Sequence, residues 1–159
     1  MLPISEDTSD LVFRALFSTI FIGLGLEHLF SDQLLQTLIP DWIGEKRLVS
    51  IAAGVVLLAG GGSILSGFHV HLGASVLGVF LVVVTALVHG PGVLGYTPET
   101  LPTETHWLWQ AYQRSNFVKN ICLLGVCVHL IRHQTGRYSL DRWLARRREV
   151  STTTPSPAP

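Results

Sequence analysis

Three ionisable side chains stand where long apolar stretches of the sequence end. Glu27 and His28 close the first stretch (11–30), and His89 closes the third (70–89). A carboxylate just inside the end of an apolar segment pairs with a cation, takes up a proton or contacts a ligand, because an unpaired charge is costly there. Beside one or two imidazoles, Glu27 would form a proton-handling or metal-binding site.

A structural role for Glu27 is the alternative. Arg114 and Lys119 lie at the start of the fourth apolar stretch (115–133). A salt bridge from Glu27 to either cation would clasp the first helix to the fourth without any chemistry. The two interpretations are about equally supported by the sequence.

Helical spacing adds further polar residues to the candidates. At about 100° per residue, positions seven, eleven or fourteen apart lie on nearly the same face of a helix. Each stretch then has a face with polar or small side chains, which predicts a bundle interior able to form hydrogen bonds. For Ser, Thr and Gly, close helix packing is the favoured interpretation. The candidate ligand-binding residues are Arg14, Glu27, His28, His89, Arg114, Asn116 and Asn120, and the candidates for catalysis are Glu27, His28 and His89.

Quinone is the favoured ligand for such a cluster. Its reduction needs an apolar pocket for the ring and placed groups that bind its oxygens and deliver protons. His28 with His89, or His71 with His129, could instead bind haem, and Glu27 with the histidines could bind a metal. Histidines near a membrane boundary more often only form hydrogen bonds, so we favour haem and metal less.

The two cysteines argue against a thiol oxidoreductase. Cys122 and Cys127 are five residues apart, about 140° around a helix, and they do not form a CxxC motif. We therefore expect them to be packing residues.

The elements that position these residues are expected to be membrane helices. Four stretches are apolar enough to span a bilayer as helices, at about 11–30, 48–66, 70–89 and 115–133, and the second and third contain no charged residue. Hydrophobic residues make up 48% of the chain and charged residues 14%, which excludes a water-soluble globule of this size. We predict an all-α integral membrane four-helix bundle forming one domain (11–133) in a lipid bilayer, with no nucleic-acid partner. A homo-oligomer is one of the open alternatives for its assembly.

Basic residues predict the orientation of this bundle. Arg132 lies at the end of the fourth stretch and five more arginines follow it, whereas the loops 31–47 and 90–114 hold few cations. The positive-inside rule then places the C-terminus and, with four spans, the N-terminus in the cytoplasm. The N-terminal segment 1–10 is acidic and has no basic n-region, so we expect no removable signal peptide.

The tail is expected to contain one more helix. Leu140, Trp143 and Leu144 have helical spacing among arginines, which predicts a short basic amphipathic helix (134–150) on anionic headgroups, before a disordered tail (151–159). The alternative is a partly disordered basic segment that serves only topology.

Several of these features together resemble the DoxX family of small four-helix membrane proteins. They are Arg14, the run FIGLGLEHLF, Pro40, the run LVSIAAGVVLLAGG, His89, and the run NFVKNICLLG, so the resemblance extends from about Leu11 to Arg132. It implies a prokaryotic inner-membrane protein whose polar core residues would be Arg14, Glu27, His28, His89 and Asn116. Some members of this family are quinone-reducing subunits that act with a thiosulfate-oxidising activity, and others associate with redox partners.

The first functional hypothesis is therefore a redox-associated, quinone-linked membrane subunit. No flavin, nucleotide or iron-sulfur motif is evident in the sequence, so such a subunit would need a redox partner protein. The alternative is a non-enzymatic scaffold or assembly factor that binds a partner through Trp107, Trp109 and Tyr112, although these aromatics also fit an interfacial belt. Solute transport ranks last, because no internal repeat or pair of broken helices is evident.

Overall fold

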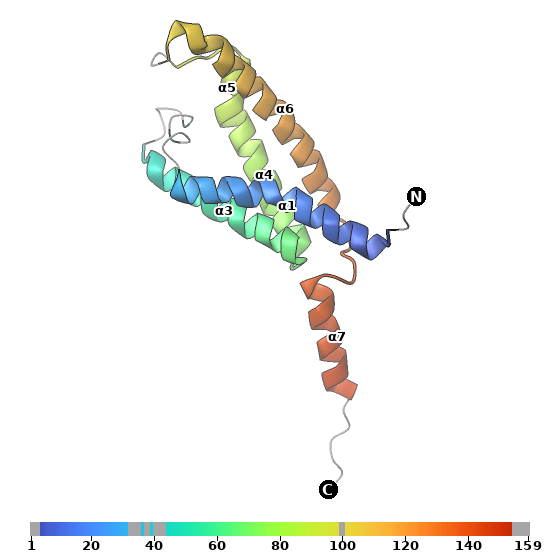
Figure 1. Cartoon of the computed structure of the whole chain (residues 1–159). Coiled ribbons are helices and arrows are strands. Elements are labelled where there is room, and N and C mark those ends of the chain that lie inside the picture. Colours follow the sequence, from blue (N-terminus) through green and yellow to red (C-terminus); the bar gives the residue numbers. More distant parts are fainter. Residues whose placement is uncertain (1–3, 32–35, 37–38, 40–43, 99–100, 154–159) are drawn as a thin grey trace.

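The chain folds into helices. The computed structural model describes residues 4–31, 36, 39, 44–98 and 101–153, and all regular elements in these ranges are helical (Figure 1). This confirms the predicted all-α class. The elements are α1 (Glu6–Phe30), α3 (Lys46–Ser66), α4 (Val70–Val84), the π-helical turn η1 (Thr85–His89), α5 (Gly90–Val93), the 3-10 turn η2 (Thr103–Thr105), α6 (His106–Leu130) and α7 (Leu140–Thr153).

Three helices in the described ranges are long and apolar enough to cross a membrane. They are α1, α3 and the continuous helix Val70–Val93, which contains α4, η1 and α5. They coincide with the first three predicted spans. α6 is as long as α1, but Arg114, Lys119 and several amide side chains make it more polar, and it does not belong to this set. The fourth span thus stays a prediction.

The helices pack in sequence order. α1 lies along α3, α3 contacts α4, and α4 lies along α6. The pair α1/α3 and the pair α4/α6 meet at the end that holds the α3–α4 turn, and they diverge toward the opposite end (Figure 1). The arrangement is two helical hairpins joined at one end, and this divergence positions the candidate site.

Glycine residues bring α1 and α3 into close contact. A Cβ atom on Gly54 would lie 3.0 Å from the carbonyl oxygen of Gly25, so the two backbones touch at this crossing. Phe17 and Phe21 of α1 and Leu57 of α3 belong to the buried core, with ring centroids of the two phenylalanines 5.1 Å apart in an edge-to-face arrangement. Close backbone contact of this kind is the usual way in which membrane helices gain packing energy.

The outward faces are apolar. Leu16 of α1, Val79 of α4 and Val118 of α6 are 72%, 66% and 60% exposed. Exposed apolar side chains over so many helices need an apolar surrounding. The described helices therefore indicate a lipid bilayer environment.

The α3–α4 turn depends on a glycine. Gly67 has φ +69°, and its amide donates to the Ile64 carbonyl while the Phe68 amide donates to the Ser63 carbonyl. This is a Schellman motif, in which a left-handed residue ends the helix. The motif turns the chain sharply enough for α4 to run back along α3.

The tail contains a further helix, but its bounds differ from the predicted 134–150, and residues 151–153, which were predicted to be disordered, belong to it. α7 begins at Leu140 and continues to Thr153, and it projects away from the other helices (Figure 1). Residues 154–159 of the predicted disordered tail, and Pro40 of the first loop, lie outside the described residues.

Candidate functional site

A cleft of about 310 Å³ lies between the diverging helical hairpins. Its walls come from α1, α3, α4, η1 and α6, and most of them are apolar. Leu24, Leu57, Phe80 and Leu123 represent this apolar part. The polar side chains that line it are His28, His89, Tyr112, Asn116, Lys119 and Asn120.

The π-helical turn η1 presents His89 to this cleft. Pro91 lacks an amide hydrogen, and in a regular α-helix its ring would meet the carbonyl group four residues earlier. The wider turn directly before Pro91 avoids this clash, and such single π turns frequently occur at functional sites. His89 is 7% exposed, and its Nδ1 lies 2.6 Å from Oε1 of Gln113. Because that oxygen can only accept, Nδ1 donates, and Nε2 is left for another partner.

Polar side chains on one face of α6 form the opposite wall. Lys119 Nζ donates to Asn116 Oδ1, and Asn116 Nδ2 donates to the Tyr112 carbonyl at 3.0 Å. The ammonium group is thus held at the edge of an apolar cleft by a neutral amide. It keeps further hydrogen atoms to donate to a ligand.

Asn120 differs from these residues. Its side chain is 6% exposed and lines the cleft, yet it makes no hydrogen bond to any residue that the structure describes. The buried side-chain atom without a partner among the described residues is Ser18 Oγ, whereas the Asn120 amide opens onto the cleft. A ligand oxygen or donor group in the cleft would satisfy this amide.

His28 lies on the α1 side of the cleft. Its Nδ1 is 3.0 Å from Ser50 Oγ, and the same hydroxyl lies 3.3 Å from the His28 carbonyl oxygen. Ser50 is fully buried on α3. The α1–α3 contact therefore orients the His28 ring.

Three of the predicted site residues lie elsewhere. Glu27 is exposed on α1 and does not line the cleft, and its carboxylate forms no salt bridge within the described ranges. Arg114 is exposed on α6, also outside the cleft. Arg14 is fully buried, but at the opposite end of the helices. The structure thus brings together His28, His89, Asn116 and Asn120 from the predicted set.

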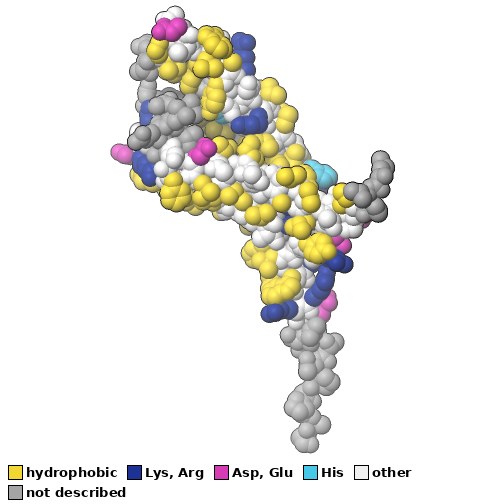
Figure 2. All heavy atoms as spheres, viewed as in Figure 1, with side chains coloured by type: hydrophobic (Ala, Val, Ile, Leu, Met, Phe, Trp, Pro, Cys, Tyr) yellow, Lys and Arg dark blue, Asp and Glu magenta, His cyan; other side chains and the backbone are white. Residues whose placement is uncertain are grey.

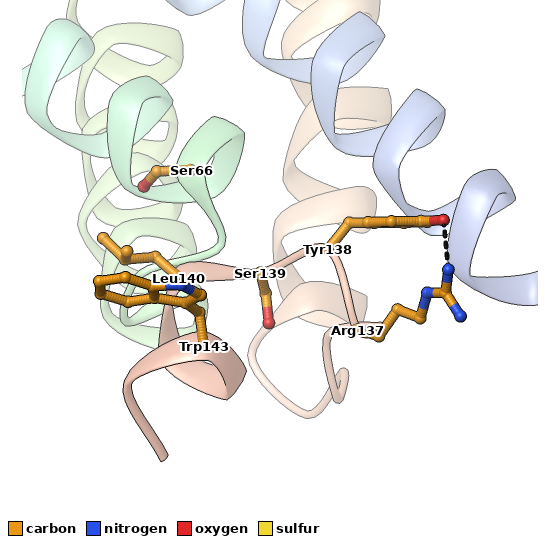
Figure 3. A pocket seen from close by; sticks show the side chains of 6 residues that line it. All are labelled: Ser66, Arg137, Tyr138, Ser139, Leu140 and Trp143. Atoms are coloured by element: carbon orange, nitrogen blue, oxygen red, sulfur yellow. Dashed lines mark hydrogen bonds between the residues drawn. The ribbon is translucent and has the colours of Figure 1, made fainter. Parts of the chain in front are cut away.

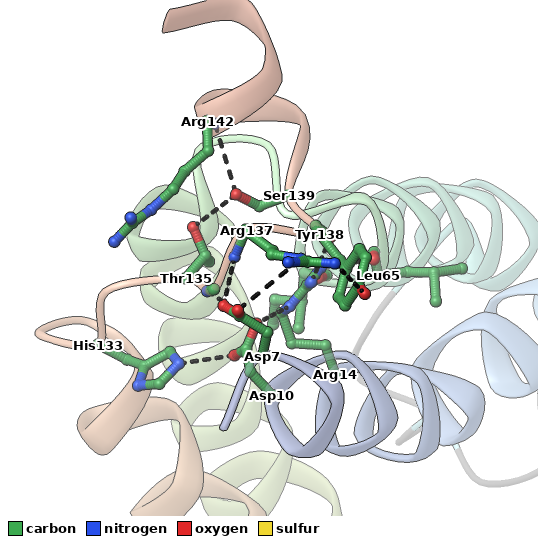
Figure 4. Close-up of polar contacts among 12 residues, drawn as sticks. Asp7, Asp10, Arg14, Leu65, His133, Thr135, Arg137, Tyr138, Ser139 and Arg142 are labelled. Atoms are coloured by element: carbon green, nitrogen blue, oxygen red, sulfur yellow. Dashed lines mark hydrogen bonds and ion pairs between the residues drawn. The ribbon is translucent and has the colours of Figure 1, made fainter. Parts of the chain in front are cut away.

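Arg14 organises that opposite end (Figure 4). Its Nε donates to Asp10 at 3.0 Å, and its Nη1 donates to the carbonyl groups of Ile64 and Leu65 at 3.3 and 2.9 Å. Its Nη2 donates to the Tyr138 carbonyl at 2.7 Å. One guanidinium therefore ties α1 to the end of α3 and to the segment before α7, which is a structural role that uses the five donors of arginine.

Asp10 completes this network. Oδ1 lies 2.7 Å from Nε2 of His133, and Oδ2 accepts from the Gly136 amide at 3.0 Å. The neighbouring Asp7 accepts from the Arg137 amide at 2.7 Å. We call the residues Asp7, Asp10, Arg14, His133, Gly136, Arg137 and Tyr138 the tail network.

Three contributors to the cleft were not among the predicted site residues. Lys119, which was considered only as a salt-bridge partner for Glu27, lines the cleft. Gln113 holds His89, and Tyr112 lines the mouth. The sequence contained a pattern that could have predicted Gln113, because this residue precedes Asn116 and Asn120 at helical spacing on the same face of α6.

The described residues contain no group of three or more His, Cys, Asp or Glu side chains that could bind a metal. His28 and His89 both line the cleft, whereas His71 and His129 are exposed; the ring of His71 meets that of His69 edge to face, and the ring of His129 lies tilted against that of His133. Cys122 and Cys127 are free thiols, the first exposed and the second buried.

Comparison with known proteins supports the family assignment. The DoxX family model matches residues 9–90, which include most of α1, all of α3 and the third helix from Val70 to Gly90. Searches of curated proteins and of solved structures found no match. The matched region ends before α6, so the α6 wall of the cleft lies outside it. Because the match covers more than half of the chain, the protein belongs to the DoxX family.

Proposed function

We propose that this protein is a quinone-linked, redox-associated subunit of a prokaryotic inner membrane, and that the cleft binds the quinone headgroup. The apolar walls suit the ring and its isoprenoid tail. His89, Lys119 and Asn120 supply groups that can hydrogen-bond the ring oxygens. His28 and His89 are the candidates for proton delivery.

The observation that carries this proposal is the open amide of Asn120. This carboxamide lines the cleft with no hydrogen bond to a described residue, and a hydrogen bond from it to a ligand would contribute about 0.5–1.5 kcal/mol. A ligand carbonyl accepting from this amide would supply that bond. A quinone has such a carbonyl, together with a flat apolar body that matches the remaining walls.

The proposal includes a fourth span. α6 packs along α4 and exposes Val118, Ile121 and Val128 on its outer face, so it can face lipid there while its polar face closes the cleft. With four spans and the arginine-rich tail in the cytoplasm, the cleft lies toward the outer leaflet. A separate redox protein would supply the electrons, which reduce the quinone together with two protons.

Titration of the protein in lipid nanodiscs with a short-chain ubiquinone tests this proposal. Asn120→Leu should weaken quinone binding about tenfold, which corresponds to one lost hydrogen bond. Because the Asn120 amide has no protein partner, the same variant should be at least as stable as the wild type. Gln134→Leu changes an exposed amide outside the cleft and serves as the control. Unchanged affinity in Asn120→Leu and Lys119→Met would overturn the proposal.

The alternative is a scaffold or assembly factor. Trp107 and Leu94 are 70% and 90% exposed at the end where the hairpins diverge, which favours contact with another protein or with headgroups. Trp109 is less suited, since its Nε1 donates to the Tyr96 carbonyl at 3.1 Å. The scaffold function would be supported if Trp107→Ala no longer captured a partner protein while Asn120→Leu and Lys119→Met still captured it.

A further inference from the structure

The start of α7 is held firmly against the other helices. Ser139 Oγ accepts from the Arg142 amide and so caps the helix. Asp141 Oδ2 accepts from the His69 amide at 2.8 Å, and the Asp141 amide donates to the Gly67 carbonyl at 3.3 Å. Together with the tail network, these bonds place the first turn of α7 directly beside the α3–α4 turn.

This position lies at the edge of the apolar part of the molecule. α1, α3 and the helix Val70–Val93 define the region that crosses the bilayer, and the α3–α4 turn is one of its ends. A helix whose first turn is bonded to that turn starts at the level of the lipid headgroups.

The side chains of α7 combine two properties. Leu140 and Trp143 are 39% and 47% exposed, and Figure 2 shows hydrophobic side chains over the start of α7 with basic side chains beside them. Residues 132–149 contain six arginines but only one aspartate and one glutamate. Arg147 lies over the ring of Trp143, 4.0 Å from its centroid, so one arginine covers the aromatic ring.

An open groove continues this apolar surface onto α3. It has a volume of about 470 Å³, and its lining residues are Ser66, Arg137, Tyr138, Ser139, Leu140 and Trp143 (Figure 3). Leu65, which precedes Ser66, and Phe68, two residues after it, are also exposed. The exposed surface is thus amphipathic, with apolar groups next to the end of α3 and arginines farther along α7.

We propose that α7 binds the anionic lipid surface of the membrane: Leu140 and Trp143 enter the headgroup region beside the end of α3, and Arg142, Arg146 and Arg148 contact lipid phosphates. Tryptophan favours this depth of the bilayer, and arginine pairs well with phosphate groups. The inference is independent of the quinone site, because it depends only on the tail and on the membrane position of the helices.

Charge complementarity and position favour lipid over a soluble partner. With the tail in the cytoplasm, as proposed above, α7 begins at the leaflet in which anionic lipids concentrate, and each arginine near such a surface strengthens binding about fivefold. A soluble acidic protein would have to compete with that surface for the same side chains.

Spin labels on the full-length protein in nanodiscs test the proposal. Cys122→Ala removes the exposed thiol, and a nitroxide is attached through Leu144→Cys on the apolar side of α7, or through Ala145→Cys on the other side as the matched position. Collision with oxygen and with a water-soluble nickel chelate reports whether each label contacts lipid or water. Discs of phosphatidylcholine alone are compared with discs that contain phosphatidylglycerol.

We expect the label at position 144 to become protected from nickel in the anionic discs, more than the label at 145. Replacing Arg142, Arg146 and Arg148 by Gln should shift the ratio of bound to free α7 about a hundredfold toward the free form. Arg114→Gln, at the far end of α6, should leave it unchanged. A label at 144 that stays in water in both kinds of disc would overturn the proposal and favour a soluble partner. If the label at 144 were equally protected from nickel in the neutral discs, and the arginine substitutions did not change this protection, the role of anionic lipid would be overturned.

Discussion

His89 and Gln113 join the π-helical turn to α6 by a hydrogen bond of 2.6 Å between Nδ1 and Oε1. Both side chains are almost completely buried. The bond determines which imidazole nitrogen carries the proton and turns the other toward the cleft. Gln113 is therefore a positioning residue for His89.

Gln113→Leu should weaken quinone binding and also destabilise the fold. The buried Nδ1–H would lose its acceptor, at a cost of about 1–3 kcal/mol, and the ring would no longer be held in one orientation. Calorimetric titration of the nanodisc protein gives the affinity, and thermal unfolding gives the stability. Gln134→Leu, an exposed amide, should change neither quantity, and normal stability of Gln113→Leu would contradict the buried hydrogen bond.

Arg14→Met should destabilise the protein by about 3–5 kcal/mol, because it removes the cation paired with the Asp10 carboxylate together with the bonds to three backbone carbonyl groups. The segment before α7 should also detach. Limited trypsin digestion, followed by mass spectrometry, should therefore show faster cleavage after Arg137 and Arg142. Arg114→Met removes an exposed arginine and should behave like the wild type; equal cleavage rates in both variants would argue against the tail network.

Gly67→Ala should unfold at a lower temperature. A left-handed conformation costs a residue other than glycine about 1–2 kcal/mol, and the new Cβ would lie 2.5 Å from Ser139 Cβ. Gly62→Ala is the matched control in α3, where a Cβ meets nothing within 4 Å and helix propensity should add about 0.5–1 kcal/mol. Thermal unfolding followed by circular dichroism measures both. Similar melting temperatures would mean that the turn has another conformation in the membrane.

Glu27→Gln and Lys119→Met should have opposite outcomes in quinone binding. Glu27 is exposed outside the cleft, so its variant should keep the wild-type affinity. Lys119 lines the cleft and can donate to a quinone oxygen, so its loss should cost about 1.5–3 kcal/mol of binding free energy, as is typical of a charged hydrogen bond. The same titration measures both variants. If only Glu27→Gln lost affinity, the Glu27 carboxylate, and not Lys119, would be the group that binds the quinone.

The cleft was only partly predictable from sequence. Helical periodicity placed His89 and the pair Asn116 and Asn120 on the inner faces of their helices, and all three line the cleft. It could not place Glu27, because a residue next to a polar face points inward or outward depending on how far the helix is rotated by its neighbours. The contact between Gly25 and Gly54 is part of what sets that rotation for α1.

The contacts of Arg14 were likewise not predictable from sequence, because most of its partners are far away in the chain. Its position near the start of the first apolar stretch indicated a polar interior residue, and it is fully buried. Its partners, however, are backbone groups at residues 64, 65 and 138. No local pattern encodes such contacts, because they exist only after the Gly67 turn and the segment before α7 have come together.

The sequence by itself determined the helical class, the family and the three apolar helices that indicate a membrane environment, because composition and periodicity are local properties that any bilayer helix must satisfy. Only the tertiary structure decided that the two hairpins diverge, that His28, His89, Lys119 and Asn120 share one cleft while Glu27 and Arg114 do not, and that Arg14 supports the tail. The physical reason is that helix rotation and crossing follow from packing between distant residues, whose free energy appears only when the surfaces meet.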